Sequence, residues 1–303
     1  MEEKKLDLNS IIGFVLISGI LIWMLYSNAP TPEELKEKEK KEQVEKQAKE
    51  VKTVTSTVAA TPVADSVKTA AAQAQLGSFG YSATLPSATD AVTEIKNDLL
   101  SLKISNKGGY ITEATVLGFD QFEKNSKKAV QLIKENNASL DVTLHTTDNR
   151  TLHTKDMYFE PKLTTEGKNQ VLTMQLKAGP DQFLEYRYVL KPNEYMLDFA
   201  IRSQGLEKVV NTAKPLDLEW QLKTFRNEKS VSYENRYTEI VFEYEDGKDD
   251  YLNAARDSED EAKDVSYIAF KQHLFTSILL TDTKFKTAKF KSDNLVDDEK
   301  VDT

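Results

Sequence analysis

Apolar and polar residues alternate along residues 95–119, whose sequence is IKNDLLSLKISNKGGYITEATVLGF. Leu100, Leu102 and Ile104 are separated by serine and lysine, so one face of this segment is apolar and the other faces water. Residues 106–109, Asn-Lys-Gly-Gly, tolerate positive φ, and the two-residue period resumes after them. The pattern therefore predicts a β-hairpin with a tight turn.

The same two-residue period recurs along the rest of the chain from about residue 90. A second hairpin is predicted at residues 184–201, around a Lys-Pro-Asn-Glu turn. Residues 216–222 alternate strictly and place Trp220 on the face that is expected to enter the core. Further strands are predicted at residues 171–176, 238–244, 266–270 and 274–281. Because no long amphipathic helix separates these strands, the pattern favours a mainly β fold, a large antiparallel β-sandwich.

An uncharged apolar run, IIGFVLISGILIWMLY, covers residues 11–26. Its Ile, Leu, Val and Phe residues contribute roughly −3 to −6 kcal/mol to membrane insertion. A helix of this length spans about 24 Å of a hydrocarbon layer that is ~30 Å thick. We therefore expect a single transmembrane anchor over residues 11–27 that contacts the lipid bilayer, with Trp23 and Tyr26 at the membrane interface.

Two properties of the anchor stay open from these residues alone. A cleaved signal peptide is the alternative, because Ser27-Asn28-Ala29 resembles a small-x-small cleavage site, although Pro30 after it disfavours cleavage. The orientation is also open, because more lysines follow the run than precede it, which opposes export of the rest of the chain.

The chain divides into four predicted parts. Residues 1–10 form a short tail before the anchor, and residues 28–89 form a flexible tether that is first Glu/Lys-rich and then rich in Ala, Thr and Ser. The β domain covers residues 90–303, and we expect its last strands to lie beyond that range.

Composition excludes several classes of function. The 303-residue chain has a net charge of −9, and its lysines lie among acidic residues, which argues against nucleic acid as a partner. It contains no cysteine, which excludes disulfides, thiolate zinc sites and a cysteine nucleophile.

The candidate chemical residues are three histidines and one acidic run. His145 and His153 flank a predicted turn at residues 148–149, so surface histidines of a hairpin are favoured over a metal or acid/base pair. His273 precedes an apolar strand and is predicted to be an edge residue. The acid-rich residues 243–264 lack the EF-hand spacing and are predicted to be a solvated loop. We predict no catalytic residue, metal site or cofactor, and a protein that is not an enzyme.

Three stretches carry a resemblance to a known family: IKNDLLSLKISNKGGYIT, YRYVLKPNEYMLDFAI and VSYIAFKQHLFTSILLTD. Together with the anchor and tether they resemble YidC, the bacterial inner-membrane protein insertase family. The opening MEEKKLDLNSIIGFVLI is similar to the form found in the Bacteroidetes. The double-glycine hairpin and the later KQHLF segment form a specific joint signal.

The resemblance implies a cytoplasmic N-terminus and a periplasmic domain with a β-supersandwich fold similar to that of sugar mutarotases. It also implies a role in the insertion, folding and assembly of inner-membrane proteins, alone or with the Sec translocon. The family's insertion groove belongs to a later bundle of transmembrane helices and holds an arginine. No second membrane-length apolar run follows Tyr26, so we expect an anchor and scaffold without this groove. The following arginines lie in the β domain and do not correspond to the groove residue: Arg187, Arg202, Arg226, Arg236 and Arg256.

Two other hypotheses are kept. A membrane-anchored, periplasmic carbohydrate-binding or mutarotase-like module would need aromatic platforms and a His/Glu pair on a concave sheet face. The alternation that places Trp220 in the core disfavours it. A structural domain that docks a translocon subunit is compatible with the insertase hypothesis.

Overall fold

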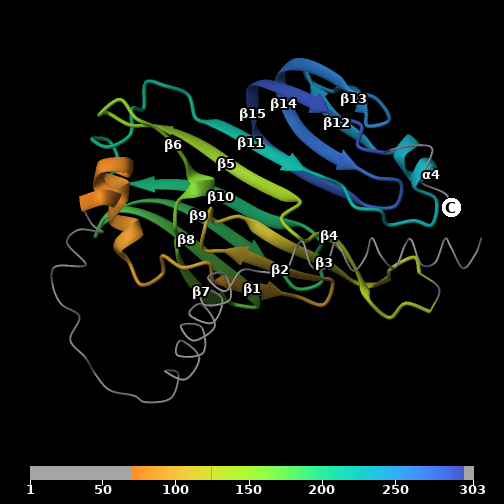
Figure 1. Cartoon of the computed structure of the whole chain (residues 1–303), viewed down its shortest axis with the longest axis horizontal. Helices are drawn as coiled ribbons and strands as arrows, with labels where there is room; N and C mark the ends of the chain where they lie inside the picture. Colours follow the sequence, from red (N-terminus) through yellow and green to blue (C-terminus); the bar gives the residue numbers. More distant parts are fainter. Residues whose placement is uncertain (1–69, 124, 297–303) are drawn as a thin grey trace, which may run out of the picture. The chain divides into compact units, whose positions relative to one another are not determined.

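The computed structural model describes residues 70–123 and 125–296, which form four antiparallel sheets (Figure 1). This mainly β, antiparallel architecture is consistent with a β-sandwich and confirms the predicted fold class at that level. The predicted anchor, with Trp23 and Tyr26, and most of the predicted tether lie outside the described residues. Within residues 70–123 and 125–296, no helix has the length and apolar character needed to cross a membrane.

The first predicted hairpin lies in a sheet of strand order β1-β2-β3-β4. Its strands are β1 (Val92–Lys96), β2 (Leu100–Ser105), β3 (Ile111–Asp120) and β4 (Ala129–Ile133). The alternating apolar residues of β2 are all buried, and Gly108 and Gly109 both have positive φ. The predicted strand, turn and strand are therefore confirmed.

Gly109 is constrained by its neighbours as well as by its φ of 67°. A Cβ atom at this position would lie 3.0 Å from the ring of Phe159. The hydroxyl of Tyr188 donates a hydrogen bond of 2.7 Å to the Gly109 carbonyl. Glycine is needed here because any side chain would strain the backbone and displace a buried ring.

The second sheet has the order β10-β9-β8-β7 and contains the second predicted hairpin. Its strands are β7 (Glu160–Glu166), β8 (Asn169–Gly179), β9 (Gln182–Leu190) and β10 (Leu197–Gln204). Leu172, Met174 and Leu176 are fully buried on one face of β8, as predicted.

The hairpin loop of this sheet is longer than the alternation predicts. Tyr195, predicted to open the second strand, lies in the loop and is 52% exposed. The side-chain amide of Asn97 donates hydrogen bonds of 2.7 Å to the carbonyls of Lys191 and Glu194. The carbonyls of Lys191 and Glu194 are thus bound by Asn97, which follows β1, and β10 begins only at Leu197.

The third sheet has the order β11-β5-β6. Its strands are β5 (Ala138–His145), β6 (Thr151–His153) and β11 (Asp217–Leu222), and the short turn η2 (Thr154–Asp156) follows β6. Trp220 of β11 is only half-buried, which corrects its predicted place in the core. Its ring lies 4.2 Å from the ring of Phe270, so a single strand of another sheet covers it.

The fourth sheet has the order β13-β12-β14-β15 and is the last in the chain. Its strands are β12 (Glu239–Tyr244), β13 (Lys248–Asn253), β14 (Ser258–Lys271) and β15 (Thr276–Ser292). β14 and β15 extend well beyond the strands predicted at residues 266–270 and 274–281. Their register shifts between Val265 and Tyr267.

The acid-rich residues 243–264 are therefore not the solvated loop that was predicted. They form β13 and the first half of β14, because Leu252, Ala262 and Val265 point inward and are buried. Acidic side chains occupy the outward positions between them, which hides the apolar alternation in the sequence.

The described chain begins in helical turns rather than in the tether predicted up to residue 89. Residues 70–76 are helical and continue into η1 (Gly77–Thr84), which contacts β8. Phe79 of η1 is completely buried. A single aromatic side chain anchors this segment to the sheet, and one residue gives no periodic signal in a sequence.

Two hydrophobic clusters lie inside these sheets. The main cluster joins the first three sheets and includes Phe79, Phe159, Tyr186 and Tyr188. The second cluster lies within the fourth sheet and consists of Ile240, Phe242, Leu252, Ala262, Val265 and Phe290.

Candidate functional site

The KQHLF segment, residues 271–275, forms the turn between β14 and β15. Phe275 packs against the main cluster, and its ring lies 5.8 Å from that of Phe119 at the end of β3. Gln272 and His273 instead contact α4 (Val231–Arg236) and the segment before it. This turn, which we call the junction, thus connects the fourth sheet to the main cluster.

Buried polar groups hold the junction together. Glu234 of α4 is 4% exposed and accepts hydrogen bonds from the backbone N–H groups of Asn227 and Glu228 (3.0 and 3.2 Å). The amide Nε2 of Gln272 donates to Glu234 Oε1 (3.1 Å) and to the carbonyl of Phe225 (2.8 Å). Burial raises the pKa of Glu234, while the backbone hydrogen bonds oppose this shift.

The same Gln272 also accepts a hydrogen bond. Asn227 Nδ2 donates to Gln272 Oε1 at 3.1 Å. The two amides and the carboxylate therefore fix the segment before α4 against the turn, and each of these buried groups has a partner.

His273 lies at the surface of the junction, in the turn before β15 rather than at a strand edge. Its Nδ1 is 2.6 Å from Glu228 Oε1. Its ring centroid lies 5.3 Å from that of Tyr233 and 4.9 Å from that of Tyr237. The two tyrosines stand four positions apart on α4 and its C-cap, so both rings lie on the side of the helix that faces His273.

Aromatic rings and cations continue from this point across neighbouring loops. The guanidinium of Arg226 lies 4.5 Å from the ring centroid of Phe122, and Lys134 Nζ lies 4.6 Å from that of Phe225. Seven cations lie on the contributing segments: Lys127, Lys128, Lys134, Lys223, Arg226, Lys229 and Arg236. Within the described part of the chain none of the seven forms an ion pair.

We define the junction surface as these seven cations and five exposed apolar or aromatic residues. The five are Phe119, Phe122, Tyr233, Tyr237 and Leu274, which are between 36% and 64% exposed. The longest segment of the junction surface, KTFRNEKSVSYENRY, mixes aromatic and basic residues without a regular period, so the sequence alone does not mark this surface.

The other two histidines lie on the third sheet, where β5 and β6 form the predicted hairpin around a turn at Asn149, which has a φ of 63°. His145 and Thr151 are opposite one another in this hairpin. His153 Nδ1 is 2.6 Å from the carboxylate of Asp141, which is 2% exposed. The two histidines therefore have separate partners and do not form a pair.

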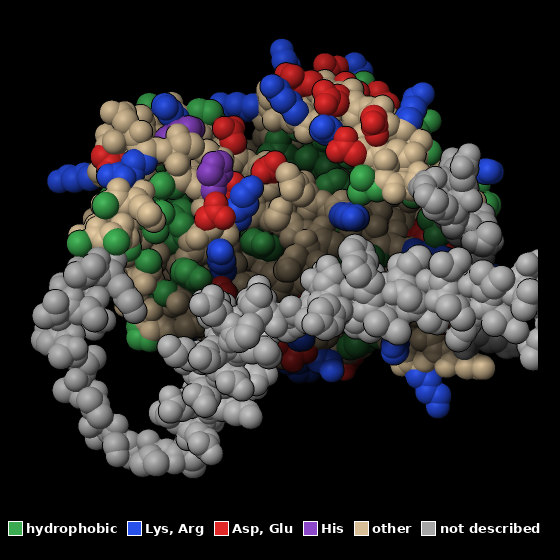
Figure 2. Space-filling view, in the orientation of Figure 1, with side chains coloured by type: hydrophobic (Ala, Val, Ile, Leu, Met, Phe, Trp, Pro, Cys, Tyr) green, Lys and Arg blue, Asp and Glu red, His purple; other side chains and the backbone are tan. Residues whose placement is uncertain are grey.

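A buried hydrogen-bond chain continues from Asp141 into the main cluster. The Thr154 hydroxyl donates to Asp141 Oδ1 (3.2 Å) and accepts from the hydroxyl of Tyr186 (3.0 Å). Burial raises the pKa of the Tyr186 hydroxyl, so it stays protonated as the donor at neutral pH. Figure 2 shows a histidine beside carboxylate and basic side chains on this side of the molecule. These hydrogen bonds orient His153, and neither of the two pockets described below is lined by it.

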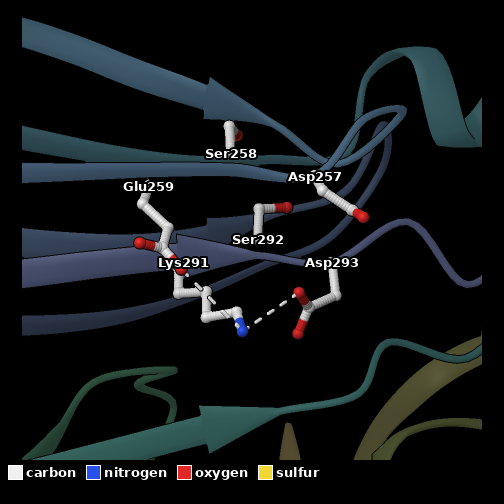
Figure 3. A pocket seen from close by; sticks show the side chains of 6 residues that line it. All are labelled: Asp257, Ser258, Glu259, Lys291, Ser292 and Asp293. Atoms are coloured by element: carbon white, nitrogen blue, oxygen red, sulfur yellow. Dashed lines mark ion pairs between the residues drawn. The ribbon is translucent and has the colours of Figure 1, made fainter.

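The pocket at the ends of β14 and β15 is open and polar (Figure 3). It has a volume of about 410 Å³ and is lined by Asp257, Ser258, Glu259, Lys291, Ser292 and Asp293. Lys291 Nζ lies 3.9 Å from Glu259 and 3.5 Å from Asp293, so the charged groups of this pocket form ion pairs with one another. Without an aromatic or aliphatic wall, the pocket lacks the usual character of a small-molecule site.

A second pocket lies on the junction surface, between the β3–β4 loop and Arg226. Its volume is about 40 Å³, which is room for little more than water. The residues that the structure describes contain no group of three His, Cys, Asp or Glu side chains able to hold a metal ion.

Comparisons with known proteins agree with this picture. Residues 92–302 match the family described as the YidC periplasmic domain. The chain is 29% identical over 293 residues to a membrane protein insertase YidC from Porphyromonas gingivalis strain W83, covering 94% of this chain and 45% of that protein. It is 29% identical over 301 residues to one from Parabacteroides distasonis, covering 95% and 46%. The chain spans about half the length of the curated relatives it matches.

One solved structure shares a weaker likeness. A galactose mutarotase-related enzyme from Lactobacillus acidophilus matches with a TM-score of 0.35 and 12% sequence identity, covering 66% of this chain and 79% of that one. A likeness at this level carries no argument about fold or function.

The antiparallel sheets, the open surface and the family match together define the class, which is that of periplasmic domains from membrane protein insertases. Within that class the chain belongs to the YidC family, since the match covers most of its residues. The resemblance found in the sequence is thereby confirmed.

Proposed function

We propose that this chain is the anchor and periplasmic scaffold of a membrane protein insertase. The whole protein assists the insertion, folding and assembly of inner-membrane proteins, alone or with the Sec translocon, and these 303 residues supply its anchor and periplasmic domain. The family match over residues 92–302 is the observation that carries the proposal. The large buried core, together with open pockets of polar character, supports a scaffold rather than a catalyst.

The proposed topology combines the apolar run with the family resemblance. Residues 11–27 cross the inner membrane once, with Trp23 and Tyr26 at the interface. The family resemblance, rather than the lysine count, gives the N-terminus its cytoplasmic side. The β domain then lies in the periplasm, and we propose that it completes a β-supersandwich similar to that of sugar mutarotases. The tether connects the two.

Protease accessibility tests this topology. Protease added to spheroplasts is expected to digest the β domain, and inverted membrane vesicles are expected to protect it. A β domain digested only in inverted vesicles, or recovered as soluble protein without residues 11–27, would contradict the proposal.

Complementation tests the scaffold role. Vesicles depleted of their own insertase and supplied with the 303-residue chain alone are expected to insert no client protein, because the chain spans about half the length of its curated relatives. A full-length relative serves as the positive control. Restoration of client insertion by the chain alone would overturn the assignment as a scaffold.

The carbohydrate-binding alternative has a direct test of its own. Trp220 packs against Phe270 and is not an open aromatic platform, and His153 is held by Asp141 rather than by a convergent glutamate. No mutarotation activity and no binding on a glycan array are expected. Specific binding of one sugar class would favour the alternative.

A further inference from the structure

We propose that the junction surface rests on the anionic headgroups of the bilayer that holds the chain. The inference depends on the proposed function, which places the β domain at the outer face of the inner membrane. It specifies which side of the domain faces the lipid.

The distribution of charge selects this side. Residues 119–135, 223–237 and 272–275, which build the junction surface, carry eight Lys and Arg and five acids. Of these acids Glu234 is buried and Glu228 contacts His273, so three exposed acids remain. The fourth sheet, residues 239–292, instead carries twelve acids and eight basic residues, and eleven of the acids lie in residues 239–264. Figure 2 shows carboxylates over the upper part of the molecule, where this sheet lies, with Lys and Arg side chains among them. An anionic membrane repels the acidic side and attracts the basic one.

The apolar members of the junction surface suit a headgroup layer. Tyr233 and Tyr237 are 44% and 39% exposed, and rings with one polar and one apolar edge favour the membrane interface. Leu274, at 64% exposure, projects from the turn beside them. Arg226 covers Phe122 and donates to backbone carbonyls of Glu228 and Lys229.

Three exposed acids, Asp120, Glu123 and Glu135, lie on the segments of this surface itself, whereas Asp293 lies on the far side of α4. Asn235 Nδ2 donates to Asn294 Oδ1 (3.3 Å), next to Asp293. Asn235 is two positions from Tyr233, so the two side chains lie on roughly opposite faces of the helix. The carboxylates near Asn294 therefore do not share the face that presents the tyrosines.

The shape of the junction surface favours lipid over a peptide partner. Peptide recognition usually needs a groove or side-chain pockets, whereas the pocket found here has a volume of only about 40 Å³. Mobile headgroups adapt to a surface without grooves, and the cations attract their phosphates.

The absence of cysteine permits a direct test. A single Leu274→Cys substitution in the 303-residue chain carries an environment-sensitive fluorophore, and the chain is reconstituted in vesicles that contain lipids with a headgroup-level quencher. Leu163→Cys on β7 is the matched control, because Leu163 is also exposed (49%) and lies outside the junction surface. Only vesicles whose β domain is accessible to protease from outside are compared.

The probe at position 274 is expected to be quenched in vesicles containing phosphatidylglycerol, and less in phosphatidylcholine alone or at high salt. The probe at position 163 is expected to show little quenching in any of them. Neutralising three cations (K127Q, K128Q and K229Q) is expected to lower the ratio of docked to undocked domains about a hundredfold, at about fivefold per cation. K214Q, on an exposed loop elsewhere, leaves it nearly unchanged.

Equal quenching at both positions would overturn the proposal. So would quenching at position 274 that is the same in anionic and neutral vesicles and is unchanged by the triple substitution. An unquenched 274 probe that instead cross-links to an acidic protein in cells would overturn it in favour of a protein partner. If the chain resists alkaline extraction while the 274 probe stays unquenched, only the lipid-facing surface fails. If alkaline extraction releases the chain, the proposed anchored function fails.

Discussion

The main cluster and the second cluster bury their apolar residues in different ways. The main cluster contains 21 buried hydrophobic residues drawn from three sheets and η1, among the residues described. The second contains six and lies within one sheet, where the rings of Phe242 and Phe290 stack at 3.9 Å. Because this small cluster covers only part of the apolar face of the fourth sheet, we expect the sheet to depend on contacts with the rest of the domain. The fourth sheet obtains these contacts through Trp220, Phe275 and the polar groups of the junction.

The largest effect is expected from Phe159→Ala in the main cluster. Phe159 is completely buried and its ring lies 4.8 Å from that of Tyr186, so its loss leaves a cavity between sheets. The free energy of unfolding is expected to fall by about 3–5 kcal/mol. Urea unfolding of the chain in detergent measures this, with the exposed Leu163→Ala as control. A loss below that of the control would show that the main cluster does not determine stability.

Phe242→Ala is expected to act more locally. The substitution removes a ring that is 1% exposed from the small cluster, at a cost of about 3 kcal/mol within the fourth sheet. Hydrogen exchange is expected to accelerate in β12–β15 and to change little in β7–β10. If both sheets accelerate equally, the two clusters unfold as one unit and the contrast between them disappears.

Gln272→Ala tests the attachment between the two regions. It removes the donor to Glu234 and Phe225 and the acceptor for Asn227, and unsatisfied buried groups cost about 1–3 kcal/mol. We expect faster exchange in α4 and in the turn, measured against the exposed Gln221→Ala. Unchanged exchange at the junction would mean that apolar contacts alone hold the fourth sheet in place.

The smallest effect concerns pH. Burial raises the pKa of Glu234 above the ordinary value of 4.5 for a glutamate, so between the unfolded and folded pKa values the folded state binds more protons than the unfolded state. Stability from this group is therefore present below 4.5 and is lost as pH rises through the folded pKa. Relative to E234Q, the natural chain is expected to gain stability as pH falls from neutrality. Parallel pH profiles of the two proteins would show that Glu234 does not titrate in this range.

The sequence predicts the fold best where alternation and burial coincide. The apolar faces of β2 and β8 were identified because every second residue is apolar and the intervening residues are polar. Prediction failed for β13 and the start of β14, where acids fill the outward positions around Leu252 and Ala262. It failed for η1 as well, because only its contact with β8 explains why Phe79 is buried.

The candidate site was much less accessible to sequence reasoning. KQHLF was recognised only as a family signal, since its partners are distant: Gln272 and Glu234 are 38 positions apart. Trp220 was assigned to the correct face of β11, but alternation does not say which element covers that face. Trp23 and Tyr26 lie outside the described residues, and their role stays a prediction.

The side-chain amide of Gln272 has two roles: its Nε2 donates hydrogen bonds, and its Oε1 accepts one. A carboxylate in the same space could not donate a hydrogen bond to Glu234 and would add a second negative charge beside it. A methionine could neither donate to Glu234 nor replace the amide oxygen as an acceptor. Replacement of Gln272 is therefore expected to be unfavourable for a chemical reason, because both hydrogen-bonding roles depend on one amide group.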